Sequence, residues 1–262
     1  QLTICVSDNI FYFVIGKYYS PSSLGLYTRA ETLVNLFSKN IEQTLNSIIF
    51  PTLCKINDDR ERLVSVFNDF LSVTSFLAAF FTLNFVAVSD NFISVALGAK
   101  WIITSYYMKI LVISAFFHPV NTINIRIANV LGYSDVFANA IAFQRTLWII
   151  LAVTGIYTSF ETLLYGTIPV SILTYIYNVN KVKKMIGISV KHQFKDLIIN
   201  SLPSFAGAIL IWLIGYYLPF NKIVALIIQI CFGIILFYFY FEKTQLPVYL
   251  KTKEIIFKMI NK

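Results

Sequence analysis

The segment Ser23–Phe50, with the sequence SLGLYTRAETLVNLFSKNIEQTLNSIIF, combines two features that decide the fold. At about 1.5 Å per residue it is long enough to cross the roughly 30 Å hydrocarbon core of a bilayer as a helix. It also carries a stripe of polar side chains at helical spacing along about five turns. The stripe consists of Thr28, Glu31, Thr32, Asn35, Lys39, Glu42, Gln43 and Asn46. Because charged groups at such depth are costly against lipid, the stripe must face protein or water.

Two interpretations of this stripe remain open. The side chains could satisfy one another between helices, which is a common role of isolated polar residues inside membranes. They could instead line a water-filled cavity. A stripe this long and this rich in polar residues exceeds what helix–helix adhesion requires, so we favour the cavity.

The composition of the whole chain places this segment in a membrane protein. The chain has 262 residues, of which 57% are hydrophobic and 13% are charged, and its mean hydropathy is +0.71. Soluble domains carry about 25% charged residues, so the chain lacks the charge to cover a water-facing surface. The abundance of Phe and Tyr excludes a disordered chain. We expect an all-α integral membrane protein.

Apolar runs predict about eight transmembrane helices and a tail. The tail, Val248–Ile260, is either a basic amphipathic segment on the membrane surface or a frayed end. The predicted crossings are Leu2–Gly16, Ser23–Phe50 (ended by Pro51), Glu61–Val88, Thr104–Leu131, Ser134–Tyr157, Glu161–Val182, Asp196–Leu218 and Asn221–Phe241.

The basic residues sort to one side of this topology. The opposite loops hold only Lys17, Lys100 and Lys222. The positive-inside rule makes the basic side cytoplasmic, and the C-terminus ends there. The net charge of +8 is therefore a topology signal, and we expect no nucleic-acid partner. The basic side holds Lys55, Arg60, Arg62, Lys181, Lys183, Lys184, Lys191, Lys195, Lys243, Lys251, Lys253, Lys258 and Lys262.

Polar residues also recur on other predicted helices. Asn121 and Thr122 lie on one face of Thr104–Leu131 with Arg126 near its edge, and Arg145 lies deep in the next helix. His118 shares that face, although a lone histidine is more typical of packing. The chain has no HExxH, P-loop or GxSxG motif, so we expect neither catalytic residues nor a metal site. Short outward loops and mixed-sign polar faces favour transport over catalysis.

Several short motifs resemble one known family. Leu24–Tyr27 is followed by Arg29-Ala30, Asn40-Ile41, Phe50-Pro51, Asp58-Asp59 and Arg62-Leu63; farther along come Leu97–Trp101 (LGAKW), the run from Ile110 to Gly132 and Ser134-Asp135. In order and spacing these motifs resemble the polysaccharide-transport branch of the multidrug/oligosaccharidyl-lipid/polysaccharide (MOP) superfamily, the Wzx-like O-antigen or exopolysaccharide flippases.

The resemblance implies an architecture of fourteen helices, with two six-helix lobes around a central cavity and two extra helices at the end. This chain would be the second lobe (1–184) plus the two extra helices (185–242), followed by a cytoplasmic tail (243–262), that is, a fragment that lacks the first lobe. Relatives carry Pro and then Gln where this chain has Phe37 and Lys39. The resemblance therefore gives Lys39 no support.

The resemblance also implies a function. The substrate would be an oligosaccharide on undecaprenyl pyrophosphate, moved across the bacterial inner membrane without a cofactor. The expected partners are membrane lipids, the missing N-terminal lobe and polysaccharide polymerase machinery. An H⁺ or Na⁺ gradient could act through Asp8 or Glu42. The candidate groups for the pyrophosphate are Arg29, Lys39, Arg126 and Arg145, and those for the sugar are Asn35, Gln43, Asn46, Asn121 and Thr122.

Two alternatives remain. A multidrug exporter of the same superfamily would have more apolar cavity walls with one or two carboxylates. A membrane-embedded polysaccharide polymerase or glycosyltransferase would have a long outward loop with paired carboxylates. Only Asp90 and Glu161 are predicted to lie in outward loops, which disfavours the enzyme.

Overall fold

The computed structural model describes residues 9–217 and 221–243, and every regular element in these ranges is helical. Five segments are long and apolar enough to cross a membrane: α3, η2 with α4, α5, α7 and α8. The elements are η1 (Ile15–Tyr19, a π-helical turn), α2 (Pro21–Lys55), α3 (Arg60–Ala96), η2 (Ala99–Trp101), α4 (Ile102–Val130), α5 (Ser134–Tyr157), α6 (Phe160–Ile186), α7 (Val190–Tyr217) and α8 (Lys222–Lys243).

Local sequence signals set the helix ends. The Ser20 hydroxyl accepts a hydrogen bond from the backbone N–H of Ser23 (3.0 Å) and so caps α2, with Pro21 in the first turn. The Asp59 carboxylate caps α3 in the same way. Gly187, with φ of 81°, ends α6 in the left-handed conformation that glycine adopts without strain.

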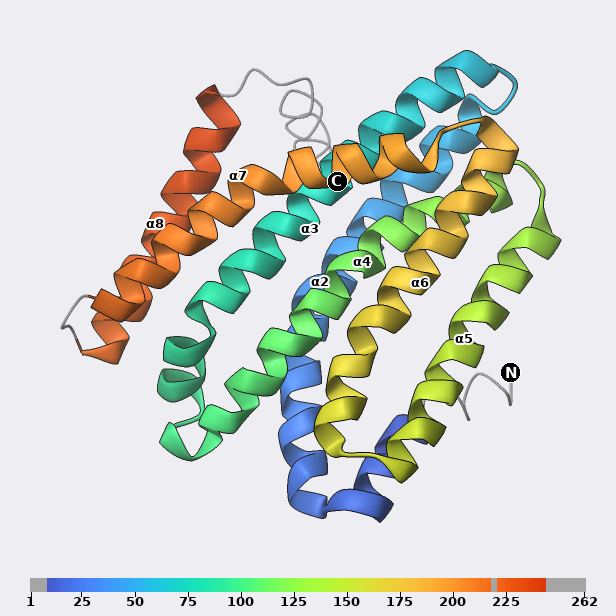
Figure 1. Cartoon of the computed structure of the whole chain (residues 1–262). Coiled ribbons are helices and arrows are strands. Elements are labelled where there is room, and N and C mark those ends of the chain that lie inside the picture. The colour runs from blue at the N-terminus through green and yellow to red at the C-terminus, as the bar shows by residue number, and fades with distance from the viewer. Residues whose placement is uncertain (1–8, 218–220, 244–262) are drawn as a thin grey trace.

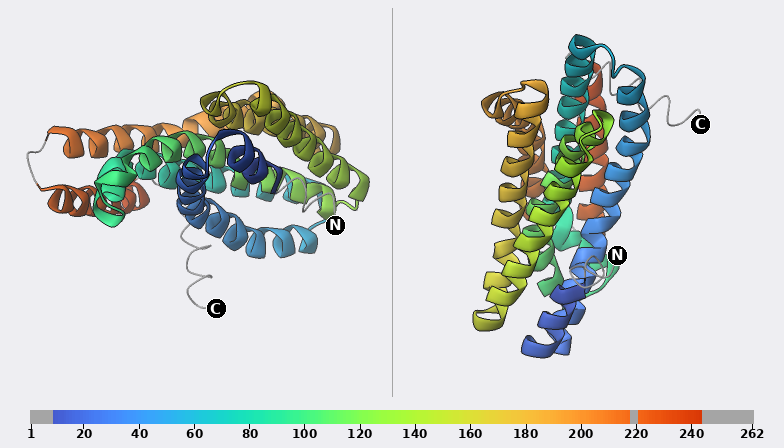
Figure 2. Two further views of the ribbon diagram at one scale, coloured as in Figure 1. Left: turned by 90° about the horizontal axis from the view of Figure 1, so that it is seen from below. Right: turned by 90° about the vertical axis from the view of Figure 1, so that its right-hand side faces the viewer.

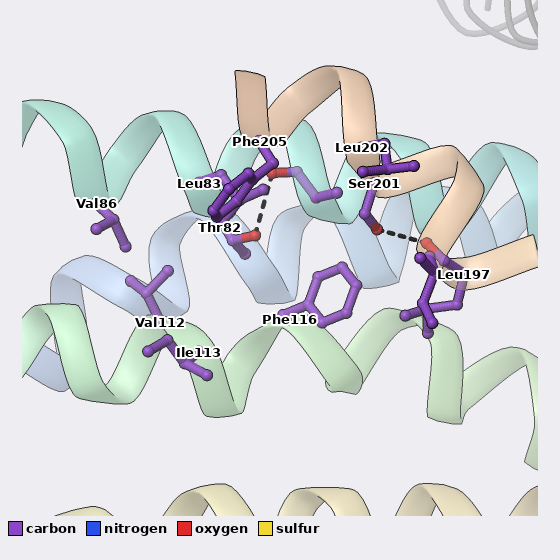
Figure 3. A pocket seen from close by; sticks show the side chains of 12 residues that line it. Thr82, Leu83, Val86, Val112, Ile113, Phe116, Leu197, Ser201, Leu202 and Phe205 are labelled. Atoms are coloured by element: carbon purple, nitrogen blue, oxygen red, sulfur yellow. Dashed lines mark hydrogen bonds between the residues drawn. The ribbon is translucent and has the colours of Figure 1, made fainter. Parts of the chain in front are cut away.

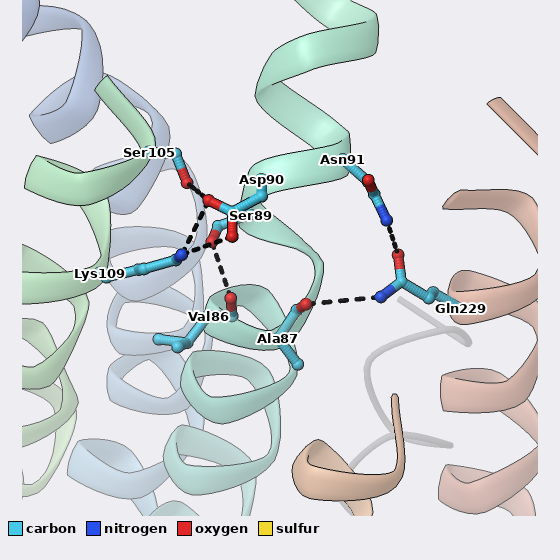
Figure 4. Close-up of polar contacts among 8 residues, drawn as sticks. All are labelled: Val86, Ala87, Ser89, Asp90, Asn91, Ser105, Lys109 and Gln229. Carbon is cyan, nitrogen blue, oxygen red and sulfur yellow. Dashed lines mark hydrogen bonds and ion pairs between the residues drawn. The ribbon is translucent and has the colours of Figure 1, made fainter. Parts of the chain in front are cut away.

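Three predicted boundaries were wrong by five residues or more, and one of them is the start of α7, which begins at Val190 and not at Asp196. Helix α2 continues through Pro51 and ends at Lys55. Only one turn follows the proline, so the ring removes a single backbone hydrogen bond near an end that would fray in any case. Helix α3 runs to Ala96, so Asp90 lies within a helix and not in an outward loop. The carboxylate of Asp90 contacts the Lys109 ammonium (2.6 Å) and the Ser105 hydroxyl (2.6 Å) on α4 (Figure 4).

Helix α4 is the centre of the bundle and packs against α2, α3 and α6, while α5 packs on α6. Helices α7 and α8 form a hairpin that packs on α3 and projects to one side (Figures 1 and 2). The connections alternate between the two ends of the bundle (Figure 1).

The basic turns α2–α3 and α6–α7 lie at the same end. The Arg60 guanidinium donates to the backbone carbonyl of Met185 (3.0 Å), which joins the two turns directly. Lys55, Arg62 and the lysines from Lys181 to Lys195 therefore gather at one end of the bundle, as the sequence-based topology requires. The tail Val248–Ile260 lies outside the described residues.

A polar contact fastens the hairpin to the lobe. Gln229 on α8 is 1% exposed; its amide donates to the carbonyl of Ile211 on α7 (2.9 Å) and accepts from Asn91 on α3 (2.9 Å). Gly215 on α7 allows this approach, because a Cβ there would lie 2.2 Å from the Gln229 nitrogen. Figure 4 shows Gln229 reaching from α8 to Asn91 and Ala87 on α3.

Candidate functional site: a polar cavity and the exposed face of α2

A polar cavity of about 110 Å³ lies inside the helix bundle, between α2, α4, α5 and α6. Since one water occupies about 30 Å³ of liquid, the cavity has room for three or four waters. Its walls are mostly carboxylate, amide, imidazole and hydroxyl groups, with one indole. The lining residues are Glu42, His118, Asn121, Thr122, Ile125, Gln144, Trp148, Ser171 and Thr174.

Hydrogen bonds fix the wall formed by α2 and α4. The hydroxyl of Thr122 donates to the Glu42 carboxylate (2.7 Å), which joins the two helices. Asn121, 7% exposed, accepts at its side-chain oxygen from the amide of Asn178 on α6 (3.0 Å). The side-chain oxygen of Asn178 is buried without a hydrogen-bond partner. Such groups are rare in folded proteins, and this one lies directly behind the cavity.

The wall formed by α6 is also hydrogen-bonded. The hydroxyls of Ser114 on α4 and Ser171 on α6 lie 2.6 Å apart, and Ser114 also donates to the carbonyl of Thr167 (3.1 Å). These bonds hold α4 and α6 together without charge. The carboxylate of Glu42 is therefore the anionic group in a wall of otherwise neutral or basic polar side chains.

The polar stripe continues from the cavity onto the surface of α2. Arg29, Lys39 and Gln43 are exposed, whereas Glu31 and Asn35 are half-buried. The hydroxyl of Tyr12, on the preceding helical segment, donates to the Glu31 carboxylate (2.6 Å). The stripe thus has a buried edge, which contacts neighbouring helices, and an exposed edge.

This arrangement can bind polar groups but offers little for catalysis. Amides and hydroxyls donate and accept hydrogen bonds, as sugars and water require. Trp148 adds a flat apolar wall and packs edge-on against Phe11, with ring centroids 5.3 Å apart. Among the described residues there is no group of three or more His, Cys, Asp or Glu side chains that could hold a metal ion.

The structure brings together three of the predicted site residues, Glu42, Asn121 and Thr122, in the cavity wall. The others lie elsewhere. Arg29, Asn35, Lys39, Gln43 and Asn46 lie along α2, Arg126 on α4 places its guanidinium 6.0 Å from the ring of Phe137, and Arg145 is half-buried on α5. Asp8 lies outside the described residues.

Sequence reasoning missed half of the cavity. Gln144 and Trp148 are one helical turn apart on α5, and Ser171 and Thr174 have helical spacing on α6. Thr167, Ser171, Thr174 and Asn178 form a polar stripe on α6 that helical periodicity alone could have found. His118, interpreted as a packing residue, contributes to the cavity wall.

Known proteins match this chain in sequence and in fold. Residues 1–106 match the family model described as "Polysaccharide biosynthesis protein". The lipopolysaccharide biosynthesis protein WzxC of Escherichia coli K12 is 26% identical over 96 residues, which cover 37% of this chain and 20% of WzxC. The resemblance to the polysaccharide branch of the MOP superfamily is confirmed.

The fold has a solved counterpart. The structure of the lipid II flippase MurJ, in an inward closed conformation, superposes on this chain with a TM-score of 0.70 at 18% identity. The match covers 100% of this chain and 52% of MurJ, so the chain spans about half the length of that flippase. The predicted all-α membrane fold is therefore confirmed.

Proposed function

We propose that this chain is the second lobe, with two additional helices, of a flippase for lipid-linked oligosaccharide in the bacterial inner membrane. The observation that carries the proposal is the exposed polar face of α2, which presents Arg29, Lys39 and Gln43. The similarity to WzxC, a lipopolysaccharide biosynthesis protein, and to MurJ, a lipid II flippase, supports the substrate class.

The chemistry of the substrate accounts for the two parts of the site. An undecaprenyl pyrophosphate head needs cations, and guanidinium or ammonium groups bind phosphate oxygens through charge-assisted hydrogen bonds. Arg29 and Lys39 on α2 would take this role, joined by Arg126 and Arg145. The sugar would contact neutral groups that both donate and accept, namely Asn35, Gln43, Asn46, Asn121 and Thr122.

Translocation would proceed by rocking of this lobe against a second lobe, which exposes the path to each side in turn. Residues 1–184 form the lobe in this proposal, 185–242 the additional helices, and 243–262 a cytoplasmic tail. Glu42 lines the polar cavity, and with Asp8 it is the candidate for coupling to H⁺ or Na⁺. Substrate would move from the basic, cytoplasmic side outward and then to polymerase machinery.

Cysteine accessibility tests the aqueous path. In the full-length protein with Cys5, Cys54 and Cys231 replaced by serine, Asn35→Cys and Asn46→Cys should react with a membrane-impermeant thiol reagent. The matched control is Ile234→Cys, on the exposed apolar face of α8, which should not react. If both α2 positions stay unreactive in every state of the transport cycle, the proposed path is wrong.

Removal of cationic groups tests whether the proposed site needs positive charge to bind the pyrophosphate of the substrate. Lys39→Gln combined with Arg126→Gln in the full-length protein should abolish display of surface polysaccharide. Lys183→Gln combined with Lys184→Gln removes the same charge from an exposed turn and should leave display intact. Normal display by the first double variant would remove both residues from the site.

A further inference from the structure

An apolar, wedge-shaped pocket of about 300 Å³, called the wedge below, lies between α7 and α4 and is also lined by α3. This volume is at the lower end of the roughly 300–1,000 Å³ range of ligand pockets. Side chains of all three helices converge on the space (Figure 3). The lining residues are Ala79, Thr82, Leu83, Val86, Val112, Ile113, Phe116, Leu197, Ile198, Ser201, Leu202 and Phe205.

The wedge offers no polar group to a ligand. Its two hydroxyls bond back to their own helices: Thr82 donates to the carbonyl of Ala78 (2.6 Å) and Ser201 to that of Leu197 (2.6 Å). The floor is buried, whereas the rim is open, with Ile198 56% and Leu202 58% exposed. The space therefore suits a hydrocarbon chain that enters from the side.

The position of the wedge separates it from the polar site. Its walls come from the central parts of α3 and α4 and from α7, all of which are apolar enough to span a membrane. Helix α4 stands between the two spaces: Val112 and Phe116 face the wedge, whereas Asn121 and Thr122 face the polar cavity. The wedge opens toward lipid.

Basic side chains stand beyond one end of the wedge. Lys191 and Lys195 are exposed in the first turns of α7. Along the helix axis, Lys195 lies about 10 Å and Lys191 about 16 Å before Leu202, at 1.5 Å per residue. The nearby Asp196 carboxylate is paired with His192 (2.9 Å). An amphiphile with its chain beside Leu202 would have its head group at these ammonium groups.

We propose that the wedge between α3, α4 and α7 binds one acyl chain of an anionic phospholipid, with its phosphate at Lys195 and Lys191. Apolar walls select the chain, and the adjacent lysines select negative charge in the head group, as basic sites at the ends of membrane helices do. The occupant is a lipid of the bilayer that stays bound beside α7 and is not itself transported.

Photo-crosslinking in the full-length protein tests the site. The protein is reconstituted in phosphatidylcholine vesicles that contain a small fraction of phosphatidylglycerol with a diazirine in its acyl chain, and labelled peptides are identified by mass spectrometry. Peptides with Val112–Phe116 and Leu197–Phe205 should carry several-fold more label than the exposed α8 peptide with Ile234. The same diazirine on phosphatidylcholine should label them less.

Matched variants separate the two parts of the site. Ile198→Trp fills the wedge and should reduce the label several-fold, whereas Ile199→Trp, on the neighbouring exposed position outside the lining, should not. Lys191→Gln with Lys195→Gln should reduce phosphatidylglycerol labelling to the phosphatidylcholine level. Lys183→Gln with Lys184→Gln removes equal charge elsewhere and should have no effect.

Three results would overturn the proposal: label no greater than at α8, equal labelling by both lipids with no effect of the lysine variants, or protection of the wedge by a polyprenyl phosphate but not by unlabelled phosphatidylglycerol. Labelling requires no translocation. A protein with Lys39→Gln and Arg126→Gln should therefore still label, so that failure of the flippase function and failure of this lipid site are separate outcomes.

Discussion

Helices α2 and α8 expose opposite kinds of surface. On α8 the exposed face is apolar from Ile223 to Phe239, with Ile227 and Ile234 among its residues. On α2 the exposed face carries Arg29, Lys39 and Gln43. A lipid-facing surface has to be apolar, because nothing in the hydrocarbon satisfies a charge. The contrast indicates that α8 faces lipid and that α2 faces water or another polar surface.

The inner sides of the two helices do not differ in this way. Helix α2 buries apolar groups such as Val34, Leu45 and Ile49, and α8 buries Ala225 and Leu226 together with the amide of Gln229. The exposed faces, and not the buried ones, therefore distinguish the two helices.

The largest expected effect comes from one lysine placed on each exposed face. Ile234→Lys, near the middle of α8, should oppose membrane insertion by about 3 kcal/mol. Leu36→Lys, near the middle of α2 and similarly exposed, should be tolerated because that face is already polar. The amount of each full-length variant in the membrane fraction measures the difference. Equal losses would show that both helices face lipid.

The buried edge of the α2 stripe should depend on its bond to α4. Thr122→Val leaves the Glu42 carboxylate without its 2.7 Å donor, and loss of a hydrogen bond to a charged group costs about 2 kcal/mol. Thr52→Val, which removes only a hydroxyl bonded to its own helix, is the control. Thermal unfolding of the detergent-purified protein should show a lower midpoint for Thr122→Val alone. Equal midpoints would mean that Glu42 finds other partners.

The smallest expected effect is on stability, when a methyl group is added at two glycines that differ in how tightly they are packed. Gly215→Ala places a Cβ against the Gln229 amide, which three helices hold in place, and should destabilise the protein by about 1 kcal/mol through overpacking. Gly25→Ala on α2 meets no atom within 4 Å and should be neutral or slightly stabilising. The same unfolding assay measures both variants. An unchanged midpoint for Gly215→Ala would show that α7 and α8 can shift to accommodate the added Cβ at little cost in free energy.

The existence of the helices was predictable, because apolar runs long enough to cross a bilayer have few alternatives to helical structure in a chain of this composition. Ser134–Tyr157 was predicted with the bounds that α5 has in the structure. Boundaries failed where tertiary contacts decide them: Asp90 remains helical because Lys109 and Ser105 on α4 satisfy its carboxylate. No single-helix pattern contains that information.

The site was predictable along each helix but not between helices. Periodicity identified the α2 stripe and the pair Asn121 and Thr122, since residues on one helix share a face at fixed spacing. It could not show that Glu42 meets Thr122, or that Gln144 and Trp148 close the same cavity, because the rotation of α5 and α6 depends on packing. Charged residues such as Arg145 were predicted as site residues, whereas the small hydroxyl residues Ser171 and Thr174 were not.

The attachment of the α7–α8 hairpin through Gln229 has an architectural consequence. Since the pair docks on α3, at the periphery, it enlarges the apolar perimeter of the bundle and takes no part in the walls of the polar cavity. Gain or loss of such an outer pair during evolution would alter the surface that the protein presents to surrounding lipids and would leave the polar cavity unchanged.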